Sequence, residues 1–178
     1  MGVGQIKRAV FLDRDGVLNP VVMRGGSPAS PRGLAEFSLT PGAGEQVARL
    51  KDAGYLVIVV TNQPDVARGL LPQDELEAMH RVLAEGLGPD EIRFCPHDDH
   101  HACACRKPKP GMLTQAAALR GIDLAASWMV GDGYKDMEAA RAAGVRAVLI
   151  SADYNARVEA PQRVADLAEA VDLILEQG

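Results

Sequence analysis

The 178-residue sequence has no long apolar run and no excess of positive charge. No apolar run approaches the roughly 20 residues needed to cross a bilayer, and residues 1–8 lack the apolar core of a signal peptide. We therefore expect no membrane association and a cytoplasmic location. The 19 basic and 24 acidic residues leave a net charge of −5. This balance argues against broad contact with nucleic acid or with an anionic membrane surface.

Cysteine is also scarce, and its few copies are clustered. Cys95, Cys103 and Cys105 form a Cys-x-His-x5-Cys-x-Cys pattern with His97. An odd number of clustered thiols suits metal binding better than a disulfide framework. Three sulfurs and one imidazole nitrogen suit a closed tetrahedral Zn²⁺ site, which would be structural because no position remains for water.

Two alternatives to this zinc site stay open. The cysteines can instead be reduced residues of a surface loop, and either histidine of the pair 100–101 is a rival nitrogen ligand. We favour His97 because its spacing from Cys95 mirrors that between Cys103 and Cys105. A zinc-bound loop would fix the direction of the cations Arg106 and Lys107 that follow it.

Short apolar runs rich in β-branched residues recur at 9–12, 56–60, 128–130 and 147–150, with a weaker one at 91–94. Such runs are typical of strands buried on both faces of a parallel sheet. Amphipathic stretches predict helices at 43–53, 73–86, 111–120, 135–143 and 162–176. The alternation predicts an α/β fold with a doubly wound, Rossmann-like parallel sheet.

The length and the 47% hydrophobic content fit one domain spanning residues 1–178. Segment 19–41 is rich in glycine and proline and is either a functional or a disordered loop. It leaves no room for a separate cap domain, so loops alone are expected to cover the site.

Asp13 and Asp15 stand where the first apolar run ends. An Asp-x-Asp-Gly sequence is alternatively an ordinary turn. However, two carboxylates at the edge of a buried strand are costly to desolvate unless a cation compensates them. A hard cation such as Mg²⁺ would do so.

Polar residues also follow the later predicted strands, and the carboxyl ends of parallel strands meet at one edge of a sheet. A hydroxyl and two amides, good donors to phosphate oxygens, follow the second strand. Two cations follow the cysteine loop, and two further carboxylates follow the fourth strand. These residues are Thr61, Asn62, Gln63, Arg106, Lys107, Asp132 and Asp136.

In this order the motifs resemble the haloacid dehalogenase superfamily, whose phosphatases carry Asp-x-Asp, then Thr or Ser, then Lys, then an acidic pair. The resemblance covers almost the whole chain. It implies that Asp13 is the nucleophile and that Asp15 is the general acid and base. The superfamily's ion-pumping ATPases carry Thr at the second position, so Asp15 favours a hydrolase.

The resemblance also implies the ligands of the metal and of the phosphoryl group. Mg²⁺ would bind the Asp13 side chain, the Asp15 backbone carbonyl and the Asp132 side chain. Thr61 and Lys107 would hold the transferred phosphoryl group. Asp136 would support this arrangement from behind the metal ligands.

With zinc included, the sequence resembles two capless families, the D-glycero-D-manno-heptose 1,7-bisphosphate 7-phosphatases and the histidinol-phosphate phosphatases. The runs at 61–69, 105–112 and 129–132 favour the heptose enzymes, whereas the short zinc loop favours the histidinol branch. We expect removal of the 7-phosphate of the heptose bisphosphate, a step of lipopolysaccharide precursor synthesis. Histidinol phosphate is the alternative substrate.

A bisphosphate suits the cations of the predicted site, because arginine pairs well with phosphate oxygens. Asn62, Gln63, Arg106 and Lys107 are the expected substrate contacts, with Arg68 and Arg24 as weaker candidates. Two features depart from the heptose enzymes. Gly133 stands where many of them have Lys, and the loop 24–32 differs.

A phospho-receiver signalling domain also gathers acids, Thr and Lys at strand ends, but its phosphorylated Asp follows the third strand, where Cys95 stands here. A zinc ribbon that binds nucleic acid would need a basic surface. Neither alternative explains Asp13 together with Asp15. We therefore expect a monomeric enzyme whose partner is a small phosphorylated sugar, without nucleic acid or membrane partners.

Overall fold

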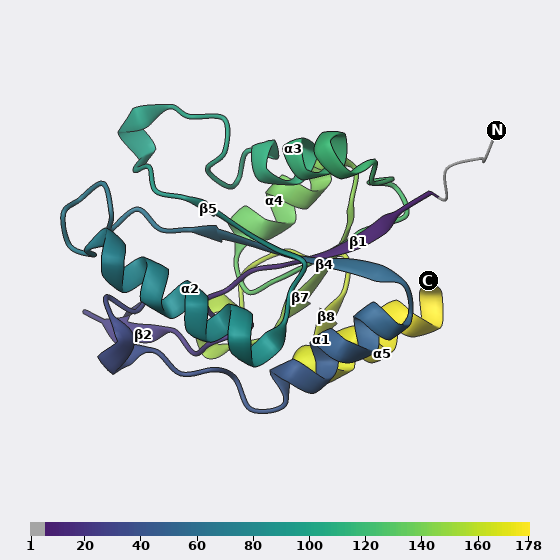
Figure 1. Ribbon diagram of the computed structural model, residues 1–178, viewed down its shortest axis with the longest axis horizontal. Helices are drawn as coiled ribbons and strands as arrows, with labels where there is room; N and C mark the ends of the chain where they lie inside the picture. Colours follow the sequence, from purple (N-terminus) through teal and green to yellow (C-terminus); the bar gives the residue numbers. More distant parts are fainter. Residues whose placement is uncertain (1–5) are drawn as a thin grey trace.

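The computed structural model describes residues 6–178 and contains one six-stranded sheet (Figure 1). The strands lie in the order β5-β4-β1-β6-β7-β8, and every adjacent pair is parallel. The chain starts in the middle of the sheet and builds outward on both sides of β1, which confirms the predicted doubly wound α/β fold. The strands are β1 (Arg8–Leu12), β4 (Tyr55–Asn62), β5 (Glu91–Cys95), β6 (Trp128–Gly131), β7 (Arg146–Ile150) and β8 (Arg163–Val164).

Within residues 6–178, five α-helices cover the two faces of this sheet (Figure 1). In β1, Val10 and Leu12 pack with α1, α2 and α5, whereas Ala9 and Phe11 pack with α3 and α4 on the other face. Because alternate residues of a strand point to opposite faces, a sheet covered on both needs the nearly unbroken apolar runs seen in the sequence. The helices are α1 (Ala43–Asp52), α2 (Gln73–Leu87), α3 (Gly111–Arg120), α4 (Tyr134–Ala143) and α5 (Leu167–Gln177).

The prediction of a final helix over 162–176 is wrong at its N-terminal end. Arg163 and Val164 pair with β7 as the edge strand β8. The helix begins only after Asp166, whose side chain accepts a hydrogen bond of 2.9 Å from the Glu169 N–H. A two-residue strand is too short to produce a periodic signal, and its pairing depends on β7, so the sequence pattern alone missed it.

The long segment between β1 and α1 is ordered structure rather than an open loop. It contains the antiparallel strands β2 (Val22–Arg24) and β3 (Ser27–Ala29) and the short 3₁₀-helix η1 (Leu34–Glu36). Two further 3₁₀-helices are η2 (Asp99–His101) and η3 (Asp153–Asn155). The β2–β3 hairpin and the segment after β5 lie at the end of the molecule opposite the C-terminus (Figure 1).

None of the helices within residues 6–178 combines the length and the apolar character needed to cross a membrane.

Candidate active site

A cavity of about 490 Å³ opens at the carboxyl ends of β1, β4 and β6. This is the edge at which the sheet topology predicts a ligand site. Most of the residues expected there line the cavity, but Gln63 is fully buried behind them. The expected residues that line it are Asp13, Asp15, Thr61, Asn62, Arg106, Lys107, Asp132 and Asp136.

Asp13 stands directly beyond β1 and is fixed by its neighbours. Its N–H donates to the Val130 carbonyl of β6 at 2.9 Å, which continues the strand pairing by one residue. Its Oδ1 accepts a hydrogen bond from the Arg14 N–H at 2.8 Å and lies 3.0 Å from Lys107 Nζ. One oxygen is thus anchored by a cation at the edge of the sheet.

Lys107 is almost completely buried and connects Asp13 with Asp136 and with the end of β4. Its Nζ donates to Asp136 Oδ1 at 2.6 Å and to the Val60 carbonyl at 2.8 Å. Burial lowers the pKa of Lys107, but the charges of Asp13 and Asp136 outweigh it and raise the pKa above the ordinary value. The lysine therefore carries a fixed positive charge.

The expected substrate contact Asn62 fastens the backbone of Lys107. Its Nδ2 donates to the Lys107 carbonyl at 2.9 Å, and its Oδ1 accepts from the Lys107 N–H at 3.0 Å. This pair of hydrogen bonds joins the end of β4 to the segment after the thiol cluster.

Three carboxylates face one another across the site. Asp13, Asp132 and Asp136 each offer an oxygen, and these oxygens all lie within 4.8 Å of one another. Burial, followed by repulsion from Asp136, raises the pKa of Asp13 well above its usual range and that of Asp132 to about 6. A divalent cation would relieve this repulsion, and an all-oxygen set is what Mg²⁺ prefers. The residues therefore fit the expected metal.

Asp136 differs from the other two acids because both of its oxygens already have partners. Oδ1 accepts from Lys107, while Oδ2 accepts from the N–H groups of Asp132 and Gly133 at 3.2 and 3.0 Å. These bonds close the turn between β6 and α4. Asp136 thus forms hydrogen bonds with both Lys107 and the backbone at Asp132.

The Asp15 side chain points to a different set of partners. Oδ2 accepts from Ser30 Oγ and Gln63 Nε2, both at 2.8 Å. Oδ1 accepts from Asn19 Nδ2 at 2.9 Å and from two nitrogens of Arg14. Burial raises the pKa of Asp15, but the Arg14 charge and these hydrogen bonds bring it below the ordinary value.

Gln63 links Asp15 to Thr61. Its Nε2 donates both to Asp15 Oδ2 and, at 2.9 Å, to Thr61 Oγ1. Thr61 lines the cavity, whereas the Gln63 amide stays in the interior. In this arrangement Gln63 orients the acid and the hydroxyl.

Several residues of the site were not expected from the sequence. Arg14 is fully buried, and its guanidinium holds Asp15. Tyr154 Oη donates to Asp132 Oδ2, and Asn155 Nδ2 donates to the Asp132 carbonyl at 2.8 Å. Tyr154 and Asn155 follow β7. A position after a predicted strand is the same signal that marks the other residues of the site.

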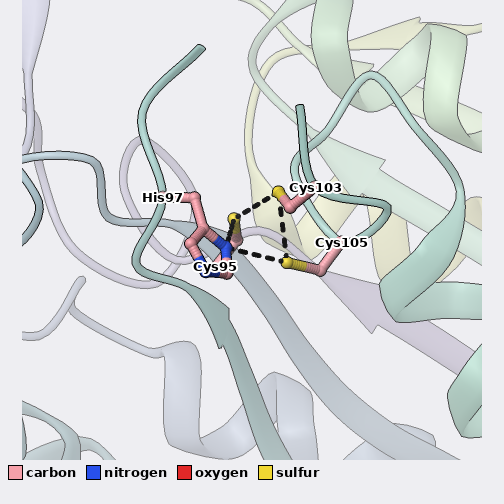
Figure 2. Close-up of side chains that lie close together, drawn as sticks. All are labelled: Cys95, His97, Cys103 and Cys105. Atoms are coloured by element: carbon pink, nitrogen blue, oxygen red, sulfur yellow. Dashed lines mark hydrogen bonds between the residues drawn. The ribbon is translucent and has the colours of Figure 1, made fainter. Parts of the chain in front are cut away.

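The predicted zinc ligands lie together at the end of β5 (Figure 2). Cys95 Sγ lies 3.5 Å from His97 Nδ1 and 3.6 Å from Cys103 Sγ. Cys105 Sγ lies 3.3 Å from His97 Nδ1 and 3.4 Å from Cys103 Sγ. The edges of a tetrahedral Zn²⁺ site with sulfur and nitrogen ligands are about 3.5–3.8 Å. The four side chains are therefore compatible with zinc, and the sulfurs are too far apart for disulfides.

The two rival histidines are placed elsewhere. His101 Nδ1 accepts a hydrogen bond from the Asp98 N–H at 3.1 Å, which caps η2. His100 stacks on His101, with ring centroids 4.0 Å apart. Of the three histidines in the loop, His97 is the one that meets the sulfurs.

The thiol cluster positions the cations that follow it. Cys105 directly precedes Arg106, whose Nε donates to Asp99 at 2.6 Å and whose Nη1 donates to the His97 carbonyl at 3.3 Å. A Cβ on Gly111 would come within 2.1 Å of the Ala104 carbonyl oxygen, so the loop packs tightly against the start of α3. The cluster and this contact hold Arg106 at the cavity wall.

A chain of ion pairs joins the loops around the cavity rim. Arg32, beyond the hairpin, pairs with Asp65 at 2.7 Å. Arg68 pairs with Asp65 at 3.2 Å and with Asp98 of the thiol loop at 2.6 Å. Three segments far apart in the sequence are thereby connected above the site.

Comparison with known proteins decides the family. The model of the haloacid dehalogenase-like hydrolases matches residues 29–144. The chain belongs to this family. The family resemblance inferred from the motifs is thus confirmed, and a receiver domain or a zinc ribbon is excluded.

Two similar proteins with named activities are phosphatases. A D-glycero-β-D-manno-heptose-1,7-bisphosphate 7-phosphatase of Pseudomonas putida is 42% identical over 148 residues, which cover 80% of this chain and 82% of the relative. The protein of the same name from Haemophilus ducreyi is 37% identical over 182 residues and is covered to 97%.

A solved structure shows the same arrangement of the chain. The D,D-heptose 1,7-bisphosphate phosphatase from B. bronchiseptica, complexed with magnesium and phosphate, superposes with a TM-score of 0.82 at 34% identity. The match covers 96% of this chain and 99% of that one. This haloacid dehalogenase-like hydrolase is therefore a phosphatase by the names of its relatives, as predicted.

Proposed function

We propose that this hydrolase removes the 7-phosphate of D-glycero-D-manno-heptose 1,7-bisphosphate through a phosphoaspartyl intermediate on Asp13, in the synthesis of lipopolysaccharide precursors. The observation that carries the chemistry is the Asp13 carboxylate 3.0 Å from the buried Lys107 and beside Asp132. The names of the relatives support the substrate.

In this proposal Mg²⁺ is held by the side chains of Asp13 and Asp132 and by the backbone carbonyl of Asp15. When bound, the metal offsets the negative charge that would otherwise keep a carboxylate and a phosphate apart. The magnesium and phosphate in the B. bronchiseptica relative support this assignment. Zn²⁺, held by the three cysteines and His97, would have a structural role only.

Asp13 then acts as the nucleophile. Its carboxylate attacks phosphorus, the bond between phosphorus and the sugar oxygen breaks, and Asp15 gives a proton to the leaving oxygen. In the second step Asp15 takes a proton from water, the water oxygen attacks phosphorus, and the bond to Asp13 breaks. Lys107 and the Thr61 hydroxyl stabilise the transferred phosphoryl group in both steps.

We infer that Asp15 enters the second step as a carboxylate. Although burial raises its pKa, the Arg14 charge and the hydrogen bonds to its oxygens hold the pKa of Asp15 below the ordinary value, which favours the carboxylate form. To donate a proton in the first step, Asp15 must be protonated and lose its pairing with Arg14. We infer that Asp15 moves toward the leaving oxygen when substrate binds.

Phosphate release from a substrate panel tests the proposal. The panel contains heptose 1,7-bisphosphate, fructose 1,6-bisphosphate and histidinol phosphate. We expect the highest kcat/KM with the heptose, and loss of turnover without Mg²⁺ or in Asp13→Asn. Preference for histidinol phosphate would replace the substrate assignment, and unchanged turnover in Asp13→Asn would remove the mechanism.

Three further expectations from the sequence remain predictions. They are a single domain over residues 1–178, a monomer, and a cytoplasmic location. Light scattering in solution tests the second, because a mass near 18.9 kDa is expected for one chain.

A further inference from the structure

Two consecutive residues of η3 hold Asp132 at different atoms. The Tyr154 hydroxyl donates a hydrogen bond to Asp132 Oδ2, and the Asn155 amide donates one to the Asp132 carbonyl oxygen at 2.8 Å. The first bond fixes the side chain of Asp132, and the second fixes its backbone. Neither Tyr154 nor Asn155 has a part in the reaction steps proposed above.

Asn155 ties η3 to the last two strands of the sheet. It is buried, and its Nδ2 also donates to the Ile150 carbonyl at the end of β7, at 2.9 Å. Its Oδ1 accepts from Arg163 Nη1 of β8 at 3.1 Å. The turn that carries Tyr154 is therefore anchored on three sides, and its hydroxyl reaches Asp132 from a fixed position.

Tyr154 takes one oxygen of the Asp132 carboxylate and leaves the other. Within residues 6–178, Tyr154 is the one hydrogen-bond donor to this side chain, and it reaches Oδ2. Asp136 differs, because both of its oxygens accept hydrogen bonds from the protein. A carboxylate that is held at one oxygen and open at the other suits a metal ligand whose direction is fixed.

The acids around Asp132 make such a contact useful. Asp13 and Asp136 each offer an oxygen within 4.8 Å of an Asp132 oxygen, and like charges at this distance repel each other. A hydrogen bond from a neutral hydroxyl opposes that repulsion without adding charge. The hydroxyl also reaches the loop after β1, since a Cβ on Gly16 would come within 2.9 Å of Tyr154 Oη.

We propose that Tyr154 is a positioning residue for Mg²⁺: its hydroxyl holds the Asp132 carboxylate in the direction in which the open oxygen meets the metal. This inference rests on the function proposed above, in which Asp132 is a metal ligand. Removing a hydrogen bond to a metal ligand typically costs about 10- to 100-fold in metal affinity. Tyr154 thus raises the affinity of the site without contacting metal or substrate.

Isothermal titration calorimetry with Mg²⁺, in the absence of substrate, tests the proposal on wild type, Tyr154→Phe and Tyr134→Phe. Tyr154→Phe removes only a hydroxyl, and because Tyr154 is 37% exposed the change leaves no cavity in the core. Tyr134 is the matched control, since it is an exposed tyrosine of the cavity wall two residues after Asp132. Thermal unfolding without metal shows that each variant is folded.

We expect Tyr154→Phe to bind Mg²⁺ about tenfold more weakly than wild type, and Tyr134→Phe to bind it with wild-type affinity. In assays with heptose 1,7-bisphosphate, Tyr154→Phe should need about tenfold more Mg²⁺ for half-maximal turnover. Its kcat should return to near the wild-type value at saturating Mg²⁺, because the reacting groups are unchanged.

Equal Mg²⁺ affinities in wild type and Tyr154→Phe, or an equal loss in both tyrosine variants, would overturn the inference and leave the proposed phosphatase activity intact. Weaker Mg²⁺ binding in Tyr154→Phe, in an enzyme that releases no phosphate from the heptose, would contradict the proposed substrate while supporting the role of Tyr154. The two failures are therefore distinguishable.

Discussion

Gly16 lies in the loop after β1, next to the Asp132 carboxylate. Its φ of +83° is in the left-handed region, and an added Cβ would come within 2.0 Å of Asp132 Oδ2. Gly88 has a similar φ of +64°, but a Cβ there meets nothing within 4 Å. Both glycines therefore have a left-handed backbone conformation that other residues adopt poorly. They differ in whether neighbouring atoms occupy the space of an added Cβ.

Replacing each of them by alanine separates the two effects. Gly16→Ala and Gly88→Ala should both lose about 1 kcal/mol of unfolding free energy, since alanine adopts this conformation poorly. Only Gly16→Ala should weaken Mg²⁺ binding, by about tenfold or more, because it displaces Asp132. Titration calorimetry with Mg²⁺ measures this, and equal affinities in the two variants would argue against Asp132 as a ligand.

His80 in α2 predicts a pH dependence of stability. It is mostly buried against Phe94, with ring centroids 5.3 Å apart, and burial, then the Arg14 charge, lower its pKa from 6.5 to about 4. The unfolded chain therefore binds the proton more tightly. The stability that neutral His80 provides is full above pH 6.5 and is lost as the pH falls toward 4.

Urea unfolding at pH 7 and pH 5 tests this effect. Wild type should lose about 1–2 kcal/mol more than His80→Gln between these values. His100→Gln, which changes an exposed histidine, should lose as much as wild type. Identical losses in wild type and His80→Gln would show that His80 is protonated in the folded protein as easily as in the unfolded one.

At the residue scale, the sequence was informative where polar groups interrupt apolar runs. Asp13, Asp15 and Asp132 stand out because they end buried strands. Arg14 does not stand out, because an arginine between two acids usually reaches solvent. Its guanidinium lies 5.5 Å from the centre of the Phe37 ring, and no local sequence pattern predicts that contact.

At the scale of elements, the thiol loop between β5 and α3 has the clearest consequence. It leaves the edge strand β5 at Cys95 and returns to the cavity at Arg106 and Lys107. Closing a loop of this length costs conformational entropy. A metal that binds only to the folded state can offset that cost. We therefore expect zinc to contribute both stability and the alignment of the two cations.

Two histidines of the same loop provide a matched test of the zinc site. His97→Gln should lose most of the bound zinc, lower the unfolding temperature and reduce kcat/KM, whereas His100→Gln should keep about one zinc per chain. Elemental analysis after reductive purification gives the zinc content. Well under one zinc in the wild type, or full zinc in His97→Gln, contradicts the assignment.

The elements themselves were predictable to different degrees. The helices at 43–52 and 111–120 have clear ends, and the structure has them within a residue of the prediction. The β2–β3 hairpin was not predicted because its short strands, one holding a proline, bury little apolar surface. Ion pairs such as Arg32 with Asp65 tie this region to the loop beyond β4, and such contacts appear only in three dimensions.

At the scale of the whole molecule, the parallel sheet explains how distant segments become one site. The strand order around β1 brings together the segments after β1, β4 and β6 and the loop that follows β5. The order of these motifs could be predicted from the sequence, since each follows a recognisable strand. The direction in which each side chain points could not be predicted from the sequence. Asn62 and Gln63, for example, each donate a hydrogen bond to another protein group.

The central claim is that Asp13 carries the phosphoryl group during turnover. Rapid acid quenching of the enzyme with heptose 1,7-bisphosphate and Mg²⁺, followed by mass spectrometry of the peptide that contains Asp13, tests it directly. We predict a peptide heavier by one phosphoryl group, with the modification on Asp13, and none in Asp13→Asn. Turnover at the wild-type rate with no modified peptide, or with the phosphoryl group on another residue, would contradict the account.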